Sequence, residues 1–304
     1  MEIITKTLDN FVNIPSDSFV FDIETTGLSP KFCKVILIGI LFNKDNKTII
    51  KQYFAQTEDD EKDLLLAFIN DISTFDTHIT FNGLAFDIPF LNSRFNKYNI
   101  DFELNRNDDI DILNIVRPFK GLLSLSDCKL KTIEKYIGIS REDTISGKES
   151  VKLYKEFVSS KSDDLKSKIL LHNYEDIYYL GYLYKIKDIL EEKLKPIVIN
   201  NKDLFLKLIP LSFKINNSKL TLKYNIFDGN KVPINIYSDN YSILSDDKHI
   251  LLSISLNKGI DKDNNIVLFY QLNKIIPLKV NDNFLDLNIY NLCEYIIKKE
   301  LKSL

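Results

Sequence analysis

Apolar positions in the first part of the chain change from runs typical of buried strands to a helical spacing. Runs rich in Val, Ile, Phe and Leu, separated by short polar turns, predict three successive antiparallel strands, at 19–24, 34–42 and 47–54. At 58–73 the apolar residues take helical spacing behind an acidic start, which suits the N-terminal end of a helix. A strand, a helix, a strand and three helices follow, at about 78–81, 86–96, 109–113, 129–137, 149–159 and 162–192. This order predicts an α/β fold with a mixed sheet covered by helices on both faces.

The pattern changes after Lys195 and Pro196. From Leu204 to Leu272 apolar and polar residues alternate in short runs that Asn-, Asp- and Gly-rich turns interrupt, which predicts an antiparallel sheet of hairpins. A last helix, at about 285–301, carries a stripe of Leu and Ile. We therefore expect two domains, and we place them at 1–196 and 197–304. The second is the smaller one, mainly antiparallel β and ending in a helix.

The strand at 19–24 also carries two acids. Side chains alternate along a strand, so Asp22 and Glu24 point to one face, while Phe21 and Ile23 turn into the core. Two adjacent carboxylates repel each other and need a counter-charge, and a divalent cation with a preference for oxygen ligands is the simplest one. The alternative is an ordinary acidic triplet on a solvated surface.

Two later segments supply more acids and a histidine. Asp87 follows Asn82 and Gly83 in the first turn of the helix at 86–96, where it either joins a site or complements the helix dipole. His172 and Asp176 are four residues apart on one helix and share a face, either as part of a site or as a surface pair. The neighbouring Glu175 points elsewhere, and we expect it at the surface.

Composition and charge exclude several classes of protein. The 304 residues are 44% hydrophobic and 27% charged, as in globular proteins, with no apolar run near the roughly twenty residues that cross a bilayer. We see no secretory signal, and the three scattered cysteines predict neither a disulfide framework nor a zinc site, so we expect a cytoplasmic protein without a membrane partner. The net charge of −3 neither supports nor excludes nucleic acid binding, because a local basic surface suffices.

Asp22, Glu24, Asp87 and Asp176, together with His172, resemble the site of the DnaQ-like (DEDD) 3′–5′ exonuclease superfamily, which has an RNase H-like fold. The motifs occur in the order of that family: D-I-E-T-T-G on the first strand, N-x-x-x-F-D after the fourth, and an acid on a late helix. The run from Leu125 to Gly147 and the segment 109–113 are similar to the YprB-like branch. The resemblance covers roughly residues 17–192.

The resemblance implies a two-metal-ion mechanism with Mg²⁺ or Mn²⁺. Asp22 would bridge both ions, Glu24 and Asp176 would hold the ion that serves the attacking water, and Asp87 would act on the other ion. His172 would be the general base, since an imidazole takes up a proton near neutral pH. The histidine subclass of the family places its histidine five residues before the last acid, whereas His172 stands four before Asp176, the spacing of the tyrosine subclass.

Residues around these acids are candidates for binding the substrate. The turn of Thr25, Thr26 and Gly27 offers backbone amides to the terminal nucleotide, and three side chains would contact its sugar and base: Leu28, Asn82 and Phe86. Four basic residues would contact phosphates or remain solvated, namely Arg117, Lys129, Lys131 and Arg141. We expect Asp111 to be structural.

The sequence as a whole predicts a metal-dependent nuclease that hydrolyses phosphodiester bonds of DNA or RNA, as a 3′–5′ exonuclease on single-stranded ends. One alternative is a structure-specific endonuclease on the same site, and another is a nucleic-acid- or protein-binding module with a residual site. The aromatic residues of the C-terminal domain would form a stacking platform for single strands, a partner surface, or the ordinary interior of a sheet: Tyr224, Tyr237, Tyr241, Phe269 and Tyr270.

Overall fold

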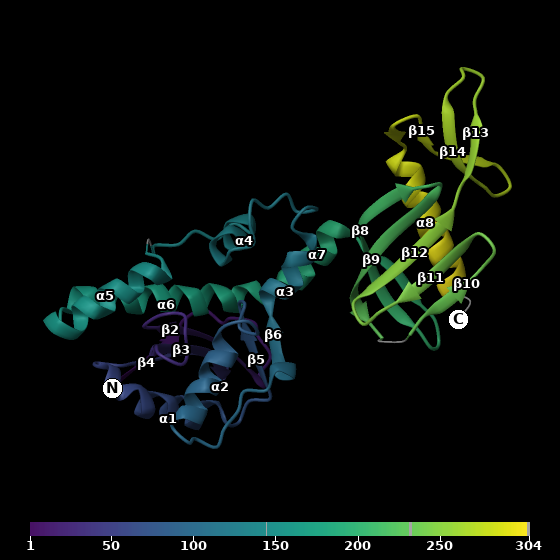
Figure 1. Ribbon diagram of the computed structural model, residues 1–304. Coiled ribbons are helices and arrows are strands. Elements are labelled where there is room, and N and C mark those ends of the chain that lie inside the picture. The colour runs from purple at the N-terminus through teal and green to yellow at the C-terminus, as the bar shows by residue number, and fades with distance from the viewer. Residues whose placement is uncertain (144, 231–232, 303–304) are drawn as a thin grey trace. The chain divides into compact units, whose positions relative to one another are not determined.

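The computed structural model describes residues 1–143, 145–230 and 233–302 (Figure 1). These residues form two compact units, Met1–Lys187 and Asp188–Leu304. The division falls near the beginning of α7 (Ile186–Leu194), whereas the change of sequence pattern predicts it near residue 197. No helix among the described residues has both the length and the apolar character that a membrane span requires.

The first unit is built on a mixed six-stranded sheet with the order β1-β4-β3-β2-β5-β6. The first four strands in this order are antiparallel, and β5 and β6 continue the sheet parallel to β2. The strands are β1 (Glu2–Leu8), β2 (Ser18–Thr25), β3 (Val35–Lys44), β4 (Lys47–Phe54), β5 (Thr77–Thr80) and β6 (Asp109–Asp111). The predicted mixed sheet is confirmed, and the edge strand β1 is an addition to it.

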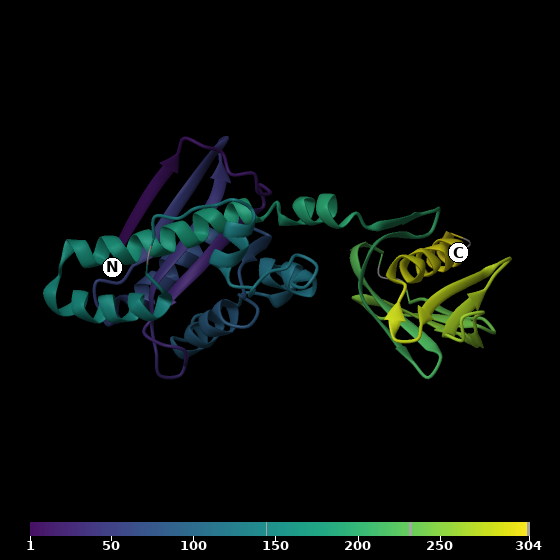
Figure 2. The same ribbon diagram turned by 90° about the horizontal axis from the view of Figure 1, so that it is seen from above.

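Helices cover both faces of this sheet, with α1 and α2 on one face and α5 and α6 on the other (Figures 1 and 2). The predicted helix at 162–192 is two helices, since α6 ends at Leu183 and α7 begins at Ile186. The helical elements of this unit are η1 (Glu58–Asp60), α1 (Glu61–Ile72), α2 (Asp87–Lys97), η2 (Arg106–Asp108), α3 (Ile112–Val116), η3 (Arg117–Phe119), α4 (Leu130–Tyr136), α5 (Gly147–Ser160) and α6 (Asp163–Leu183).

The alternation along β2 separates core residues from acids. Phe21 and Ile23 are buried in the apolar cluster that includes residues of α1 and α2, as predicted. Asp22 and Glu24 therefore point toward the face that α5 and α6 cover. Gly39 of β3, which pairs with Asp22, lets α6 come close, because a Cβ there would lie 2.2 Å from an oxygen of Asn173. The sheet thus brings the acids of β2 directly beneath α6.

The second unit consists of two antiparallel sheets and a C-terminal helix. One sheet has the order β10-β11-β12-β9-β8-β7 and the other the order β13-β14-β15-β16. The helix α8 (Asp286–Lys302) buries an apolar stripe that includes Ile289 and Leu292. The strands are β7 (Ile197–Asn200), β8 (Phe205–Asn216), β9 (Lys219–Gly229), β10 (Asn235–Tyr237), β11 (Tyr241–Ser245), β12 (His249–Ser255), β13 (Asn257–Ile260), β14 (Ile266–Gln271), β15 (Ile275–Val280) and β16 (Asn283–Phe284). The predicted β-rich fold with a final helix is confirmed.

The aromatic residues named above for this unit do not all lie on an exposed surface. Tyr224 and Tyr270 are buried in the core of the unit. Tyr241 packs against the same core, and its hydroxyl donates a hydrogen bond to Glu300. Only Tyr237 among the four tyrosines named above is largely exposed. These positions agree with the interpretation of the aromatic residues as ordinary sheet residues.

Candidate active site

All five residues expected to carry the chemistry line one cavity of about 870 Å³ in the first unit. They come from three elements that are distant in the sequence: the C-terminal end of β2, the first residue of α2, and the middle of α6. The acids are Asp22, Glu24, Asp87 and Asp176, and the histidine is His172. The fold therefore brings into one cavity five residues that are spread over more than 150 positions of the sequence.

Asp22 feels the charges of the other three acids and has few compensating hydrogen-bond donors. The Asn173 side chain of α6 donates to its Oδ2 at 3.1 Å and to its backbone oxygen at 3.3 Å. Gln52 of β4 in turn donates to Asn173 at 3.0 Å. Burial, together with the charges of the neighbouring acids, raises the pKa of Asp22 well above its usual value. Asn173 and Gln52 were not predicted, and no periodicity marks them as site residues.

Asp87 bonds to the neighbouring strand. Its Oδ1 accepts a hydrogen bond from the backbone N–H of Ile23 at 3.3 Å, and the carboxyl group is buried. Burial raises the pKa of Asp87 to about 7, although the backbone donors partly oppose the shift. The first residue of α2 is thereby fixed against β2, next to the acids of that strand.

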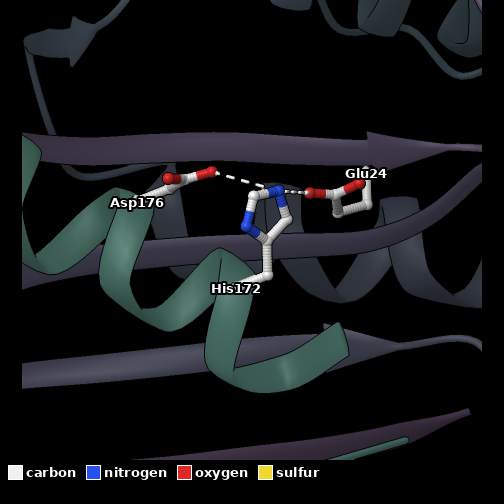
Figure 3. A group of neighbouring side chains, drawn as sticks. All are labelled: Glu24, His172 and Asp176. Carbon is white, nitrogen blue, oxygen red and sulfur yellow. Dashed lines mark ion pairs between the residues drawn. The ribbon is translucent and has the colours of Figure 1, made fainter. Parts of the chain in front are cut away.

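The side chain of His172 lies between Glu24 and Asp176 (Figure 3). Its Nε2 atom is 3.4 Å from Oε1 of Glu24 and 3.7 Å from Oδ2 of Asp176. Burial lowers the pKa of His172, but the charges of the two acids and a hydrogen bond with Asp143 outweigh it and raise the pKa. Burial is also the main reason why the pKa of Glu24 rises to about 7. One ligand atom from each of the three side chains lies within 4.8 Å of the others, a spacing that suits a metal ion.

The other nitrogen of His172 has a partner that was not predicted. Its Nδ1–H donates to Oδ2 of Asp143 at 2.8 Å, and both side chains are buried. The backbone N–H groups of Glu142 and Asp143 donate to the carboxylate of Glu175, at 3.0 and 2.8 Å. Glu175 is buried, so its expected surface position is wrong, because it fixes this loop from inside. Asp143 lies in a loop 29 residues before His172, where the sequence pattern gives no signal.

Arg141 is an internal cation of the site. Its guanidinium group forms ion pairs with Glu134 and with Oδ1 of Asp176, and only 6% of its side chain is exposed. Asp176 thus turns one oxygen toward Arg141 and the other toward His172. Arg141 was expected to contact a phosphate or to remain solvated, and the structure instead pairs it with the carboxylates of Glu134, Asp176 and, at 4.0 Å, Asp143. The ion pair with Arg141 restricts the orientation of the Asp176 carboxylate.

The residues expected to bind substrate separate into two groups. Five of them line the cavity, namely Thr25, Gly27, Leu28, Asn82 and Phe86. Thr26 is not among the lining residues, because it pairs with Lys34. The Oγ1 atom of Thr26 accepts a hydrogen bond from the backbone N–H of Lys34, and the backbone N–H of Thr26 donates one to the backbone oxygen of Lys34, both at 2.9 Å. Lys129 and Lys131 line the cavity, whereas Arg117 does not. Asp111 accepts from the N–H groups of Asn82 and Leu113, in agreement with its expected structural role.

The donor set fits divalent cations. Four carboxylates within one cavity offer hard oxygen ligands, which Mg²⁺ and Mn²⁺ prefer. The raised pKa values of Asp22, Glu24 and Asp87 reflect burial and mutual repulsion, and cations among these groups would relieve both.

Comparisons with known proteins agree with this architecture. The model of the RNase_H superfamily matches residues 19–187. The DNA polymerase III PolC-type of Ureaplasma parvum is 34% identical over 152 residues, which are 41% of this chain and 10% of that protein. The uncharacterized protein YprB of Bacillus subtilis is 28% identical over 184 residues, which are 59% of this chain and 44% of YprB. The chain therefore spans less than half the length of either relative.

Solved structures also match part of the chain. The family B DNA polymerase of the archaeon Pyrobaculum calidifontis has a TM-score of 0.44 at 15% identity, over 68% of this chain and 34% of that one. NrnC of Brucella melitensis bound to pGG has a TM-score of 0.36 at 19% identity, over 62% of this chain and 78% of that one. The resemblance to DnaQ-like nucleases and to YprB is confirmed by the superfamily match and the relatives. That match covers more than half of the sequence and includes every acid of the cavity, so the chain belongs to the RNase H superfamily.

Proposed function

We propose that the protein is a metal-dependent nuclease that hydrolyses phosphodiester bonds of DNA or RNA, acting as a 3′–5′ exonuclease on single-stranded ends. One observation carries this proposal: four carboxylates and one imidazole, from three separate elements, meet in a single cavity. The polarity and the preference for single strands rest on the motifs shared with the DnaQ-like exonucleases.

Asp22, Glu24, Asp87 and Asp176 would hold two divalent cations, Mg²⁺ or Mn²⁺. The cations would supply charge neutralisation at the phosphate and activation of the attacking water. Asp22 and Glu24 are fixed by β2, and Asp87 is fixed to the same strand through Ile23. These carboxylates are therefore held in place before any ligand arrives, which is a condition for fast chemistry.

His172 is the group that would remove the proton from the attacking water. Its Nδ1–H is committed to Asp143, so Nε2 is the nitrogen that faces the acids and can accept a proton. The charges of Asp176 and Glu24 raise the pKa of His172, and bound cations would offset these charges. Arg141 keeps Asp176 in a fixed orientation beside it. The basicity of His172 would thus depend on the cations that the neighbouring acids hold.

Single- and double-stranded DNA and RNA labelled at either end, incubated with Mg²⁺, Mn²⁺ or EDTA, would test the proposal. We expect mononucleotides released from the 3′ end of single strands, with either metal and not with EDTA. Cleavage of a circular strand would instead indicate an endonuclease on the same site. Strand binding without turnover in Mn²⁺ would indicate a binding module and contradict the proposal.

A further inference from the structure

The cavity that holds the acids also has basic lining residues that the mechanism does not use. Lys148 and Lys152 of α5 line it, and both are exposed. Residues four apart on a helix share a face, so the two lysines present their ammonium groups along one side of α5, roughly one helical turn apart. This cavity therefore combines buried carboxyl groups with exposed positive charges.

The two lysines have little internal role in the part of the chain that the structure describes: hydrogen bonds from Ser146 and, less strongly, the charge of Lys152 lower the pKa of Glu149. Neither ammonium group forms a hydrogen bond or an ion pair with a described residue. Glu149, which lies between them on α5, accepts hydrogen bonds from the hydroxyl and the N–H of Ser146. Lys131 differs, since its Nζ lies 2.9 Å from Asp143 and 2.8 Å from the oxygen of Ile145. Lys131 serves the fold, and Lys148 and Lys152 remain available to a ligand.

We propose that Lys148 and Lys152 bind successive backbone phosphates of a single strand that runs along α5 from the acidic part of the cavity. The inference rests on the proposed function and deepens it, because it makes the substrate a polynucleotide strand of several nucleotides rather than a dinucleotide. Lysine ammonium groups on flexible stems bind phosphates as point charges and read no sequence. The contact is therefore independent of the bases and sensitive to salt.

Binding of a fluorescein-labelled oligothymidylate of about twelve nucleotides, followed by anisotropy, tests the inference without requiring turnover. The full chain is used in Ca²⁺, which takes oxygen ligands, and a gel verifies that the strand stays intact. Each phosphate contact on a single strand contributes about −0.7 to the slope of log K against log salt. We expect Lys148→Gln with Lys152→Gln to weaken binding about tenfold near 0.1 M salt and to reduce the magnitude of the slope by about 1.4.

A charge-matched control distinguishes direct contact with the phosphates from general electrostatic attraction to the strand. Lys62 of α1 and Lys97 of α2 are exposed and do not line the cavity, so Lys62→Gln with Lys97→Gln should leave affinity and slope unchanged. A labelled dinucleotide should bind both double variants within about twofold of the parent, because a dinucleotide does not reach along α5. An unchanged strand affinity in the α5 variant overturns the inference, as does an equal loss in the control or an equal loss with the dinucleotide.

The two proposals fail separately. A protein whose strand binding depends on Lys148 and Lys152, but which releases no nucleotide in Mg²⁺ or Mn²⁺, would retain this inference and lose the proposed function. An active nuclease whose strand affinity does not depend on Lys148 and Lys152 would retain the proposed function and contradict this inference.

Discussion

Two clusters of buried charge in the first unit are satisfied very differently by their hydrogen bonds and ion pairs. At Glu61 one carboxylate receives a guanidinium fork from Arg94 at 2.7 and 2.5 Å, and further bonds from the hydroxyl of Tyr98 and the N–H of Val35, both at 2.8 Å. In the cavity, four carboxylates lie near one another, with His172 beside Glu24 and Asp176, and with the buried Arg141 paired with Asp176. The first cluster is complete within the fold, and the second is not.

The difference indicates what each cluster is for. A buried charge that the fold itself satisfies stabilises one conformation, and removal of a partner is costly. Burial raises the pKa of an acid that has too few hydrogen-bond donors, and such an acid lowers the stability of the fold. Proteins retain such acids where function requires them. The ion pair Glu61–Arg94 is therefore completed within the fold, whereas the cavity acids have few donors, which agrees with the metal site proposed above. Changes in the two clusters should have opposite consequences for stability and activity.

The largest effect is expected in the cavity. Asp22→Ala or Asp176→Ala should reduce metal-dependent nucleotide release about a thousandfold or more, since each removes a group that stabilises the transition state. For Asp22→Ala the unfolding free energy should stay close to that of the parent, because a buried acid that its neighbours repel is lost. Product formation from an end-labelled strand and urea unfolding measure the two quantities. Retained activity in either purified variant would refute the mechanism.

The second effect is expected at the complete cluster. Arg94→Met leaves Glu61 buried without its cation, and should lower the unfolding free energy by about 3–5 kcal/mol in urea titrations. Activity per folded molecule should remain within about twofold of the parent, because neither residue lines the cavity. Adding Glu61→Leu to Arg94→Met should recover much of the loss. No recovery would mean that the cluster stabilises the fold by packing and not by charge pairing.

A smaller effect is expected at Asp143, a positioning residue. Asp143→Ala should lower kcat about a hundredfold with KM nearly unchanged, because His172 loses the acceptor that fixes its ring. Asp143→Asn keeps an acceptor oxygen and should recover most of kcat. A parallel rise in KM, or equal losses in the two variants, would indicate a role in folding of the loop only.

The sequence was informative where regular periodicity places side chains. The period of two along β2 correctly sets Asp22 and Glu24 against the core residues Phe21 and Ile23. The spacing of four along α6 correctly puts His172 beside Asp176. Such rules depend only on local geometry, so they survive folding.

The rest of the site depends on contacts that no local rule supplies. Asn173 reaches Asp22 across 151 positions of sequence, and Asp143 meets His172 from an irregular loop. Thr26 belongs to the matching motif, yet its pairing with Lys34 turns it to a structural role in the turn. The edge strand β1 is half exposed and lacks the apolar run that revealed its neighbours. Tertiary contacts decide each of these positions.

The smallest expected effect concerns pH and Glu24 in metal-free protein. Its pKa is about 7 in the folded chain against a usual value of 4.5, so the folded state binds more protons than the unfolded one between these values. Stability contributed by this group is therefore present below about pH 4.5 and is lost as the pH rises toward 7.

The substitution Glu24→Gln removes this loss of stability at high pH. In EDTA, we expect the variant to match the parent near pH 5 and to exceed its unfolding free energy by about 1–2 kcal/mol at pH 8. Mg²⁺ at pH 8 should stabilise the parent more than the variant, because only the parent keeps the carboxylate that the ion would use. An equal pH dependence of the two proteins would show that the cavity acids are already compensated within the fold, and the contrast with Glu61 would disappear.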